Sequence, residues 1–160
     1  MALVGSSTTR IQAKTLEDAK PDLVISAAHE HVIGRRARAA ARIGAIGLHP
    51  SLLPRYRGSW PLWWALRARE REAGLTAYLL DDGIDTGPVL AQRRVPIEAR
   101  DSFASLYARI GDEVVPLLGE LIDHIRATGA LPPGEPQDET IATTFRTPGW
   151  SARLSMKLRR

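Results

Sequence analysis

The stretch AIGLHPSLLPRYRG, residues 45–58, joins a short apolar run to an abrupt turn-forming sequence. The apolar residues 45–48 predict a buried strand that ends where His49 meets Pro50. A proline lacks a backbone donor and restricts the residue before it, so Pro50 and Pro54 favour a fixed loop directly after the strand. The histidine therefore stands at the point where a buried strand gives way to a loop.

The rest of the chain alternates strand and helix patterns. Further strands are expected at residues 22–28, 75–80 and 88–95. An Arg/Ala-rich segment at residues 34–42 favours a helix. Another helix is expected to begin near Pro61, because proline suits the first helical turn, and Gly74 is expected to close it.

A long helix is predicted after Asp101 or Ser102, either of which is suited to cap it. Its apolar residues follow steps of three and four and form one stripe: Phe103, Leu106, Ile110, Val114, Leu117, Leu121 and Ile125. Pro116 should kink this helix and Gly129 should end it.

Strands that alternate with helices indicate an open, mostly parallel, Rossmann-like α/β sheet. In such sheets ligands bind beyond the carboxyl ends of the strands. Two loops are expected at that edge, one opened by His49 and the other containing Asp85. We interpret residues 1–128 as the α/β domain and residues 129–160 as a proline-containing loop with a basic tail.

Composition narrows the classes of function. The chain has 160 residues, which is enough for one domain, and no cysteine, which excludes disulfides and a cysteine nucleophile. It has no secretory signal pattern and no apolar run near 18 residues, so we expect a cytoplasmic protein that does not cross a membrane. The net charge of +4 is scattered rather than clustered, except in the tail, and nucleic acid is therefore an unlikely partner.

Three segments together resemble a known family: residues 47–58, then 74–76, then DDGIDTGPVLAQ at 81–92. They are similar to the 10-formyltetrahydrofolate-dependent formyltransferases, which act on methionyl-tRNA, glycinamide ribonucleotide or amino sugars. The resemblance covers roughly residues 20–127 and implies a formyltransferase-like α/β fold, shortened here at the amino terminus. It also implies a catalytic Asn-x-His and a distant Asp. His49 and Asp85 match these, and Gly47 stands at the Asn position.

The implied reaction transfers a formyl group from 10-formyltetrahydrofolate to an amine. A histidine can donate to the oxygen of the tetrahedral intermediate or relay a proton, and an aspartate can orient that imidazole. Gly47 has no side-chain donor, and losing one such donor typically costs about 10²–10³ in turnover. Tyr78 is a second departure, since family members often carry His there.

The resemblance also places the folate pocket. It implies that the pterin is lined by two segments: His31, Val32 and Ile33 in the first, and Asp81, Asp82, Gly83 and Ile84 in the second. His29 and His31 would share a face of a strand, which suits a metal ion. No third ligand is evident beside them, so we predict no metal site.

Several alternatives stay open from the sequence. His49 could simply end a strand, and Asp85 could be an ordinary turn residue. The acceptor is expected to be an amino sugar or another small amine rather than Met-tRNA. The chain could instead be a catalytically impaired folate-binding remnant, or it could hydrolyse the formyl group. A sheet without its first strands would expose an edge, so a homodimer is expected.

Overall fold

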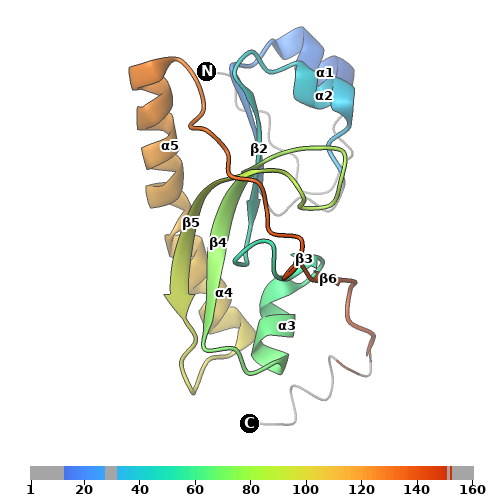
Figure 1. Cartoon of the computed structure of the whole chain (residues 1–160), viewed down its shortest axis with the longest axis vertical. Helices are drawn as coiled ribbons and strands as arrows, with labels where there is room; N and C mark the ends of the chain where they lie inside the picture. Colours follow the sequence, from blue (N-terminus) through green and yellow to red (C-terminus); the bar gives the residue numbers. More distant parts are fainter. Residues whose placement is uncertain (1–12, 28–31, 151, 153–160) are drawn as a thin grey trace.

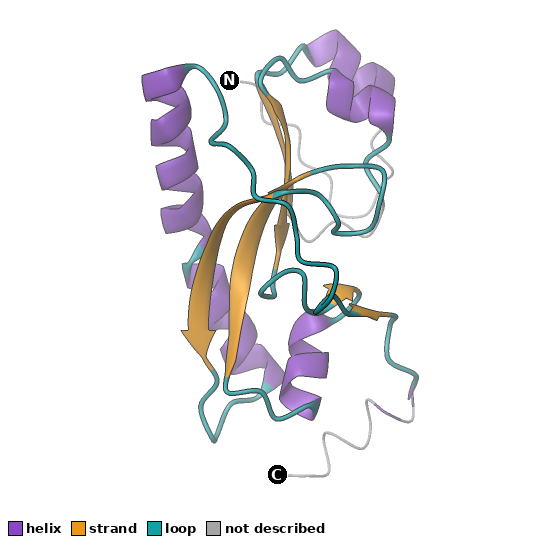
Figure 2. Cartoon of the chain, in the orientation of Figure 1, coloured by secondary structure: helices purple, strands orange, loops and turns teal. Residues whose placement is uncertain are grey.

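A computed structural model describes residues 13–27, 32–150 and 152. Strands form a central layer with helices on both sides (Figures 1 and 2). In chain order the elements are α1 Ala13–Ala19, β1 Leu23–Ala27, α2 Arg35–Ala39, β2 Gly44–His49, β3 Arg57–Gly58, α3 Pro61–Arg67, β4 Glu72–Leu79, β5 Val89–Pro96, α4 Phe103–Asp112, α5 Val114–Thr128 and β6 Thr144–Phe145.

The main sheet has the order β1-β2-β4-β5, and a second, short sheet pairs β3 with β6. The predicted class, an open α/β sheet, is confirmed. Strand directions refine the expectation of a mostly parallel sheet, because β1 and β2 are parallel whereas β4 is antiparallel to both β2 and β5. The connection between β4 and β5 holds no helix, and such a short connection cannot return the chain in parallel.

One face of the sheet carries the larger core. Ile46 and Leu48 of β2 point to this face and meet Leu75 and Ala77 of β4. The predicted helical stripe closes the core from the other side, through Leu106, Ile110, Leu117 and Leu121. Each fully buried aliphatic side chain of this kind contributes about 1.5–3 kcal/mol.

The opposite face divides into two parts. Val24 of β1 and Ala45 of β2 pack with residues of α1 and α2 in a smaller core. Beyond Ala45, the alternation of side chains along β2 brings Gly47 and His49 to this same face. The polar end of β2 therefore lies on the face that the long helices leave uncovered.

Gly74 corrects one expectation. It lies inside β4 rather than at the end of α3, which finishes at Arg67. A Cβ at residue 74 would lie 2.3 Å from the Arg93 carbonyl oxygen and 2.3 Å from Leu52 Cδ2. The glycine is required by the close approach of a neighbouring strand and loop, a role that the sequence alone does not distinguish from helix termination.

The predicted long helix is interrupted at Glu113, where α4 ends and α5 begins. Pro116 explains this, because it has no N–H to donate to the carbonyl of Asp112. Ser102 caps α4 and Gly129 ends α5 with a φ of 77°, as expected from the sequence.

Among the residues that the structure describes, none of the helices combines the length and hydropathy that crossing a bilayer requires.

Candidate active site

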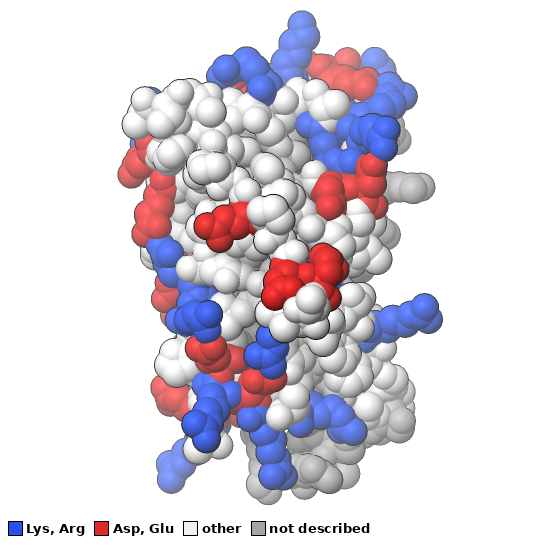
Figure 3. All heavy atoms as spheres, in the orientation of Figure 1, with Lys and Arg blue, Asp and Glu red and all other residues white. Residues whose placement is uncertain are grey.

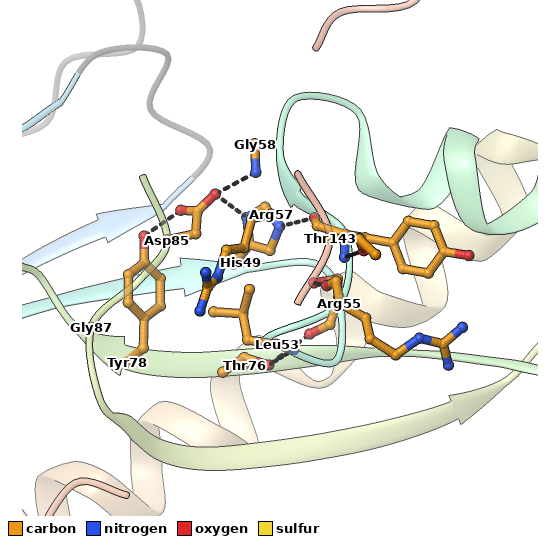
Figure 4. A network of polar contacts seen from close by, with 12 residues as sticks. His49, Leu53, Arg55, Arg57, Gly58, Thr76, Tyr78, Asp85, Gly87 and Thr143 are labelled. Atoms are coloured by element: carbon orange, nitrogen blue, oxygen red, sulfur yellow. Dashed lines mark hydrogen bonds and ion pairs between the residues drawn. The ribbon is translucent and has the colours of Figure 1, made fainter. Parts of the chain in front are cut away.

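His49 and Asp85 lie together although they are far apart in the sequence. The distance from His49 Nδ1 to Asp85 Oδ2 is 3.4 Å, and both side chains are largely buried. Figure 4 shows the carboxylate facing the imidazole. The end of β2 supplies the histidine, and the loop between β4 and β5 supplies the aspartate. The pairing that the sequence leads us to expect is therefore present.

The Asp85 carboxylate is held at both oxygens. The Gly58 N–H donates to Oδ2 at 2.7 Å, and the Tyr78 hydroxyl donates to Oδ1 at 2.6 Å. Asp85 itself adopts a left-handed backbone conformation, with φ of 55°. Non-glycine residues adopt this conformation rarely, and such strain is characteristic of functional sites.

The His49 imidazole has acceptors at both nitrogens. Its Nε2 lies 2.8 Å from the carbonyl oxygen of Tyr56, and its Nδ1 faces Asp85. A doubly protonated ring can donate to both acceptors, whereas a neutral ring can donate to only one of them. The site thus holds an imidazole that can gain or release a proton without losing all of its partners.

Gly47 and Tyr78 are direct partners across β2 and β4. Gly47 lies on the same face as His49, two residues away, and contributes no side chain. Tyr78 is buried, and its burial together with the adjacent Asp85 carboxylate raises the pKa of the phenol well above its ordinary value. Tyr78 therefore stays a hydrogen-bond donor at any working pH.

The loop after His49 is fixed by one buried threonine. Thr76, opposite His49 in the β2–β4 register, donates to the Ser51 carbonyl at 2.6 Å and accepts from the Leu53 N–H at 3.2 Å. Gln92 extends this network, donating to Thr76 Oγ1 at 2.9 Å and to the Leu53 carbonyl at 2.8 Å. These bonds hold the loop rigidly at the end of β2.

The segment after α5 contributes residues that the sequence analysis did not single out. Figure 1 shows this segment running back across the sheet to β3. Gln137 donates to the carbonyl oxygens of Asp85 and Gly87, at 2.9 and 2.7 Å. Glu139 accepts from the buried Arg57 at 2.6 and 2.9 Å, and this hydrogen bonding raises the pKa of Arg57. No periodic signal in residues 130–138 identifies these contacts.

The first predicted folate-lining segment is only partly described. His31 lies outside the described residues. Val32 is exposed, whereas Ile33 is buried in the smaller core with Val24. The Ile33 carbonyl accepts from Arg38 at 2.6 Å. Val32 is therefore the side chain of this pair that is free to meet a ligand.

The second predicted segment is the loop that carries Asp85. Asp81 accepts from the Gly83 N–H and the Thr86 hydroxyl, at 3.0 and 2.8 Å, which makes it a structural turn residue. Asp82 pairs with Arg35 and Arg38, which lower its pKa to about 2.

The tip of this loop is open to solvent. Gly83 and Ile84 are both exposed, and Ile84 is 55% exposed despite its apolar side chain. The loop thus presents an apolar tip beside the buried His49–Asp85 pair. An exposed apolar side chain of this kind is available to pack against a ligand.

Charges of both signs alternate over the surface shown in Figure 3. A groove of about 670 Å³ lies at the start of β4, the end opposite the Asp85 loop, and is lined by Arg55, Arg69, Arg71, Arg94, Glu70 and Glu72. Arg55 pairs with Glu70 and Arg94 pairs with Glu72.

Within residues 13–27, 32–150 and 152, no three His, Cys, Asp or Glu side chains gather as a metal site.

Comparison with known proteins places this geometry in context. Residues 6–121 match the family model described as formyl transferase. A methionyl-tRNA formyltransferase from Pelobacter propionicus is 33% identical over 129 residues, which cover 81% of this chain and 40% of that protein. The chain thus spans about two fifths of the length of this relative.

Two solved structures are similar in fold and sequence. The formyltransferase PseJ from Anoxybacillus kamchatkensis, in complex with UDP-4,6-dideoxy-4-formamido-L-AltNAc and tetrahydrofolate, is 26% identical with a TM-score of 0.71. The similarity covers 86% of this chain and 70% of PseJ. Phosphoribosylglycinamide formyltransferase from Bacillus halodurans is 32% identical with a TM-score of 0.57, over 62% of this chain and 51% of that one.

Proposed function

Because the chain belongs to the formyl transferase family, we propose that it transfers a formyl group from 10-formyltetrahydrofolate to an amine, with His49 and Asp85 at the reacting centre. The observation that carries this proposal is the 3.4 Å approach of the imidazole to the carboxylate at the end of β2. An imidazole oriented by a buried carboxylate is suited to move a proton between two nitrogen atoms.

The reaction needs one such proton transfer. The amine nitrogen attacks the formyl carbon and forms the new C–N bond, while negative charge develops on the formyl oxygen. The bond from that carbon to N10 of the folate then breaks, and the proton lost by the amine ends on N10. His49 relays this proton or donates to the oxygen, and Asp85 orients the ring. Since the Tyr56 carbonyl engages His49 Nε2 in this structure, substrate binding replaces that hydrogen bond.

Folate binding is proposed at the loop between β4 and β5. The exposed Val32 and the exposed Ile84, which precedes Asp85 in the chain, supply apolar contacts, and the Asp81 turn fixes the loop that carries Ile84. PseJ, a structural neighbour, was solved in complex with tetrahydrofolate, which supports a reduced folate as the formyl donor.

We propose a small amine, such as the amino group of a sugar, as the acceptor. The groove at the far end of β4 carries four arginines, but two of them are paired with glutamates. This pairing weakens the positive potential that would attract the phosphate backbone of a tRNA. PseJ was crystallised with a formamido sugar nucleotide, which supports the same class.

The test is an assay with 10-formyltetrahydrofolate and a panel of amines that includes amino-sugar nucleotides, glycinamide ribonucleotide and Met-tRNA. We expect the wild-type protein to formylate a small amine. The rate of this formylation should fall at least about 10²-fold in His49→Gln. His124, a histidine of α5 that belongs to neither loop of the centre, provides the control His124→Gln, which should keep wild-type turnover. Turnover that does not depend on His49 would reject the proposed centre.

The same assay separates hydrolysis from transfer. Gly47 offers no side-chain donor for the oxyanion, and this favours slow turnover, or folate binding without catalysis, as the second candidate. Release of formate without any amine, at a rate that an added amine does not change, would identify a hydrolase. Formyl-amine product that forms at the expense of formate would support the transferase.

A further inference from the structure

We infer that Gly47 and Tyr78 work as one unit: the Tyr78 phenol lies across Gly47, fills the space of a side chain there, and positions Asp85 toward His49. This inference rests on the proposed function for its effect on turnover. Its steric part does not depend on activity. It adds a positioning residue to the centre and gives a physical reason for the glycine.

The steric part follows from distances at residue 47. A Cβ placed there would lie 2.5 Å from both Cε1 and Cζ of Tyr78, and 2.7 Å from its hydroxyl oxygen. Real Cβ atoms do not approach other heavy atoms so closely, so the ring and a side chain at residue 47 exclude each other. An aromatic ring that covers a cross-strand glycine is a recognised way to stabilise such a pair.

The ring has little freedom to move aside. Tyr78 is only 6% exposed, and its hydroxyl is bound to Asp85 Oδ1. A shift of the ring would break this bond and leave a buried carboxylate oxygen without a donor, which is costly. Residue 47 must therefore stay a glycine as long as residue 78 is a tyrosine.

The hydroxyl has a second consequence for the centre. Tyr78 holds Oδ1 while the Gly58 N–H holds Oδ2, and Oδ2 is also the oxygen nearest to His49. Two donors on different oxygens fix the rotation of the Asp85 carboxylate about its Cβ–Cγ bond. Tyr78 is thus a positioning residue that acts on His49 through Asp85.

The steric claim is tested by unfolding in urea. We expect Gly47→Ala to lower the unfolding midpoint strongly in the wild-type background and much less in the Tyr78→Ala background. Gly119→Ala is the matched control, because a Cβ at this α5 residue meets nothing within 4 Å. If Gly47→Ala prevents folding in the wild-type background but not in the Tyr78→Ala background, the claim is supported; the reverse outcome would overturn it. An equal loss in both backgrounds would overturn the claim.

The positioning claim is tested with Tyr78→Phe, which keeps the ring and removes the hydroxyl. We expect kcat to fall about tenfold with KM unchanged, the effect of losing one hydrogen bond to a charged group. Tyr107→Phe, at an exposed residue of α4, should leave both constants unchanged. A wild-type kcat in Tyr78→Phe, or a change confined to KM, would overturn the claim.

Different measurements would reject the proposed function and the Gly47–Tyr78 unit. If the proposed function is wrong, the wild-type protein shows no His49-dependent turnover, whereas the coupling between residues 47 and 78 in urea persists. If only the inference is wrong, turnover depends on His49 but not on the Tyr78 hydroxyl, and the two substitutions act independently on stability.

Discussion

At the scale of single residues, buried polar side chains determine where the loop after β2 lies. Thr76 is fully buried and has three hydrogen-bond partners, two of which belong to the loop backbone. A buried hydroxyl with this role cannot be replaced by a methyl group of similar shape, because its partners would remain buried without bonds.

We predict that Thr76→Val lowers the free energy of unfolding by about 1–3 kcal/mol, the usual cost of buried polar groups left unpaired. It should also lower turnover, because the displaced loop carries the Tyr56 carbonyl that contacts His49. Thr76→Ser keeps the hydroxyl and is the control. Urea unfolding measures the first effect, and equal stability of the Val and Ser variants would disprove it.

Residue-scale features could be predicted from the sequence where a motif lies next to a strand end. His49 follows an apolar run directly, and the turn-rich loop marks Asp85. The partnership of Gly47 with Tyr78 could not be predicted in this way, because it depends on the register between β2 and β4. A sequence shows that residue 47 is glycine but does not show which ring covers it.

At the scale of elements, the ends of α4 illustrate how local chemistry sets boundaries. The Ser102 hydroxyl accepts from the Ser105 N–H at 3.1 Å, and the Ser105 hydroxyl accepts from the Ser102 N–H at 2.9 Å. This reciprocal pair satisfies donors that the first turn of a helix leaves open. The sequence predicts the start of the helix here because Asp101 and Ser102 are both suited to cap it.

We predict that Ser102→Ala destabilises the protein by about 1 kcal/mol, the typical value of a lost helix cap. The substitution should leave the His49 centre intact, since α4 lies against the opposite face of the sheet. Thermal and urea unfolding test the first statement. Ser102→Asp, which also caps well, should retain stability; a loss as large as that of Ala would contradict a capping role.

The link between α2 and the loop after β4 depends on charge. Hydrogen bonds from Arg35 and Arg38 lower the pKa of Asp82 from 3.8 to about 2. A carboxylate whose folded pKa is lowered adds stability above its unfolded pKa and loses it as the pH falls through the folded value. The contribution of Asp82 is therefore complete above about pH 4 and disappears toward pH 2.

We predict that Asp82→Asn is less stable than the wild type at pH 6 and that the difference shrinks as the pH is lowered toward 2. Urea midpoints measured at both pH values test this. Asp112→Asn, at an exposed residue near the end of α4, provides the control and should show a much smaller difference at pH 6. A difference for Asp82→Asn that grows on acidification would have the wrong sign and refute the ion-pair account.

At the scale of the whole molecule, the return of the chain after α5 joins distant parts of the site. Gln137 binds the backbone of the Asp85 loop from 52 residues away, and Glu139 binds Arg57 from 82 residues away. The pairing of β3 with β6 continues this contact. The His49 loop and the Asp85 loop are thus held by the same segment.

We predict that Gln137→Ala lowers turnover and lowers the free energy of unfolding by about 1–3 kcal/mol, since it removes part-buried bonds to the Asp85 and Gly87 carbonyls and the acceptor of the Arg57 guanidinium. Thr140→Ala is the control, because in the described part of the chain the Thr140 hydroxyl bonds to Asp138, two residues away. Unchanged turnover in Gln137→Ala would show that the Asp85 loop keeps its position without this segment.

This tertiary role marks the limit of prediction from the sequence. Residues 130–138 have no helical or strand periodicity, and their prolines indicate only a loop. Loop contacts of this kind are set by the elements on which the loop packs, not by its own pattern. The boundary at residue 128 and the homodimer both stay predictions. Gly74 lies inside β4 and not at the predicted helix end, because glycine serves helix ends and close strand contacts alike.

The most direct test of the central claim is a crystal structure with a hydrolysis-resistant 10-formyl folate analogue. The account predicts that the pterin lies beside the loop of Asp85 and that the formyl group lies within about 3–3.5 Å of the His49 imidazole, the separation required for reaction. An analogue bound in the arginine groove at the far end of β4, with His49 still closed off by the Tyr56 carbonyl, would contradict it.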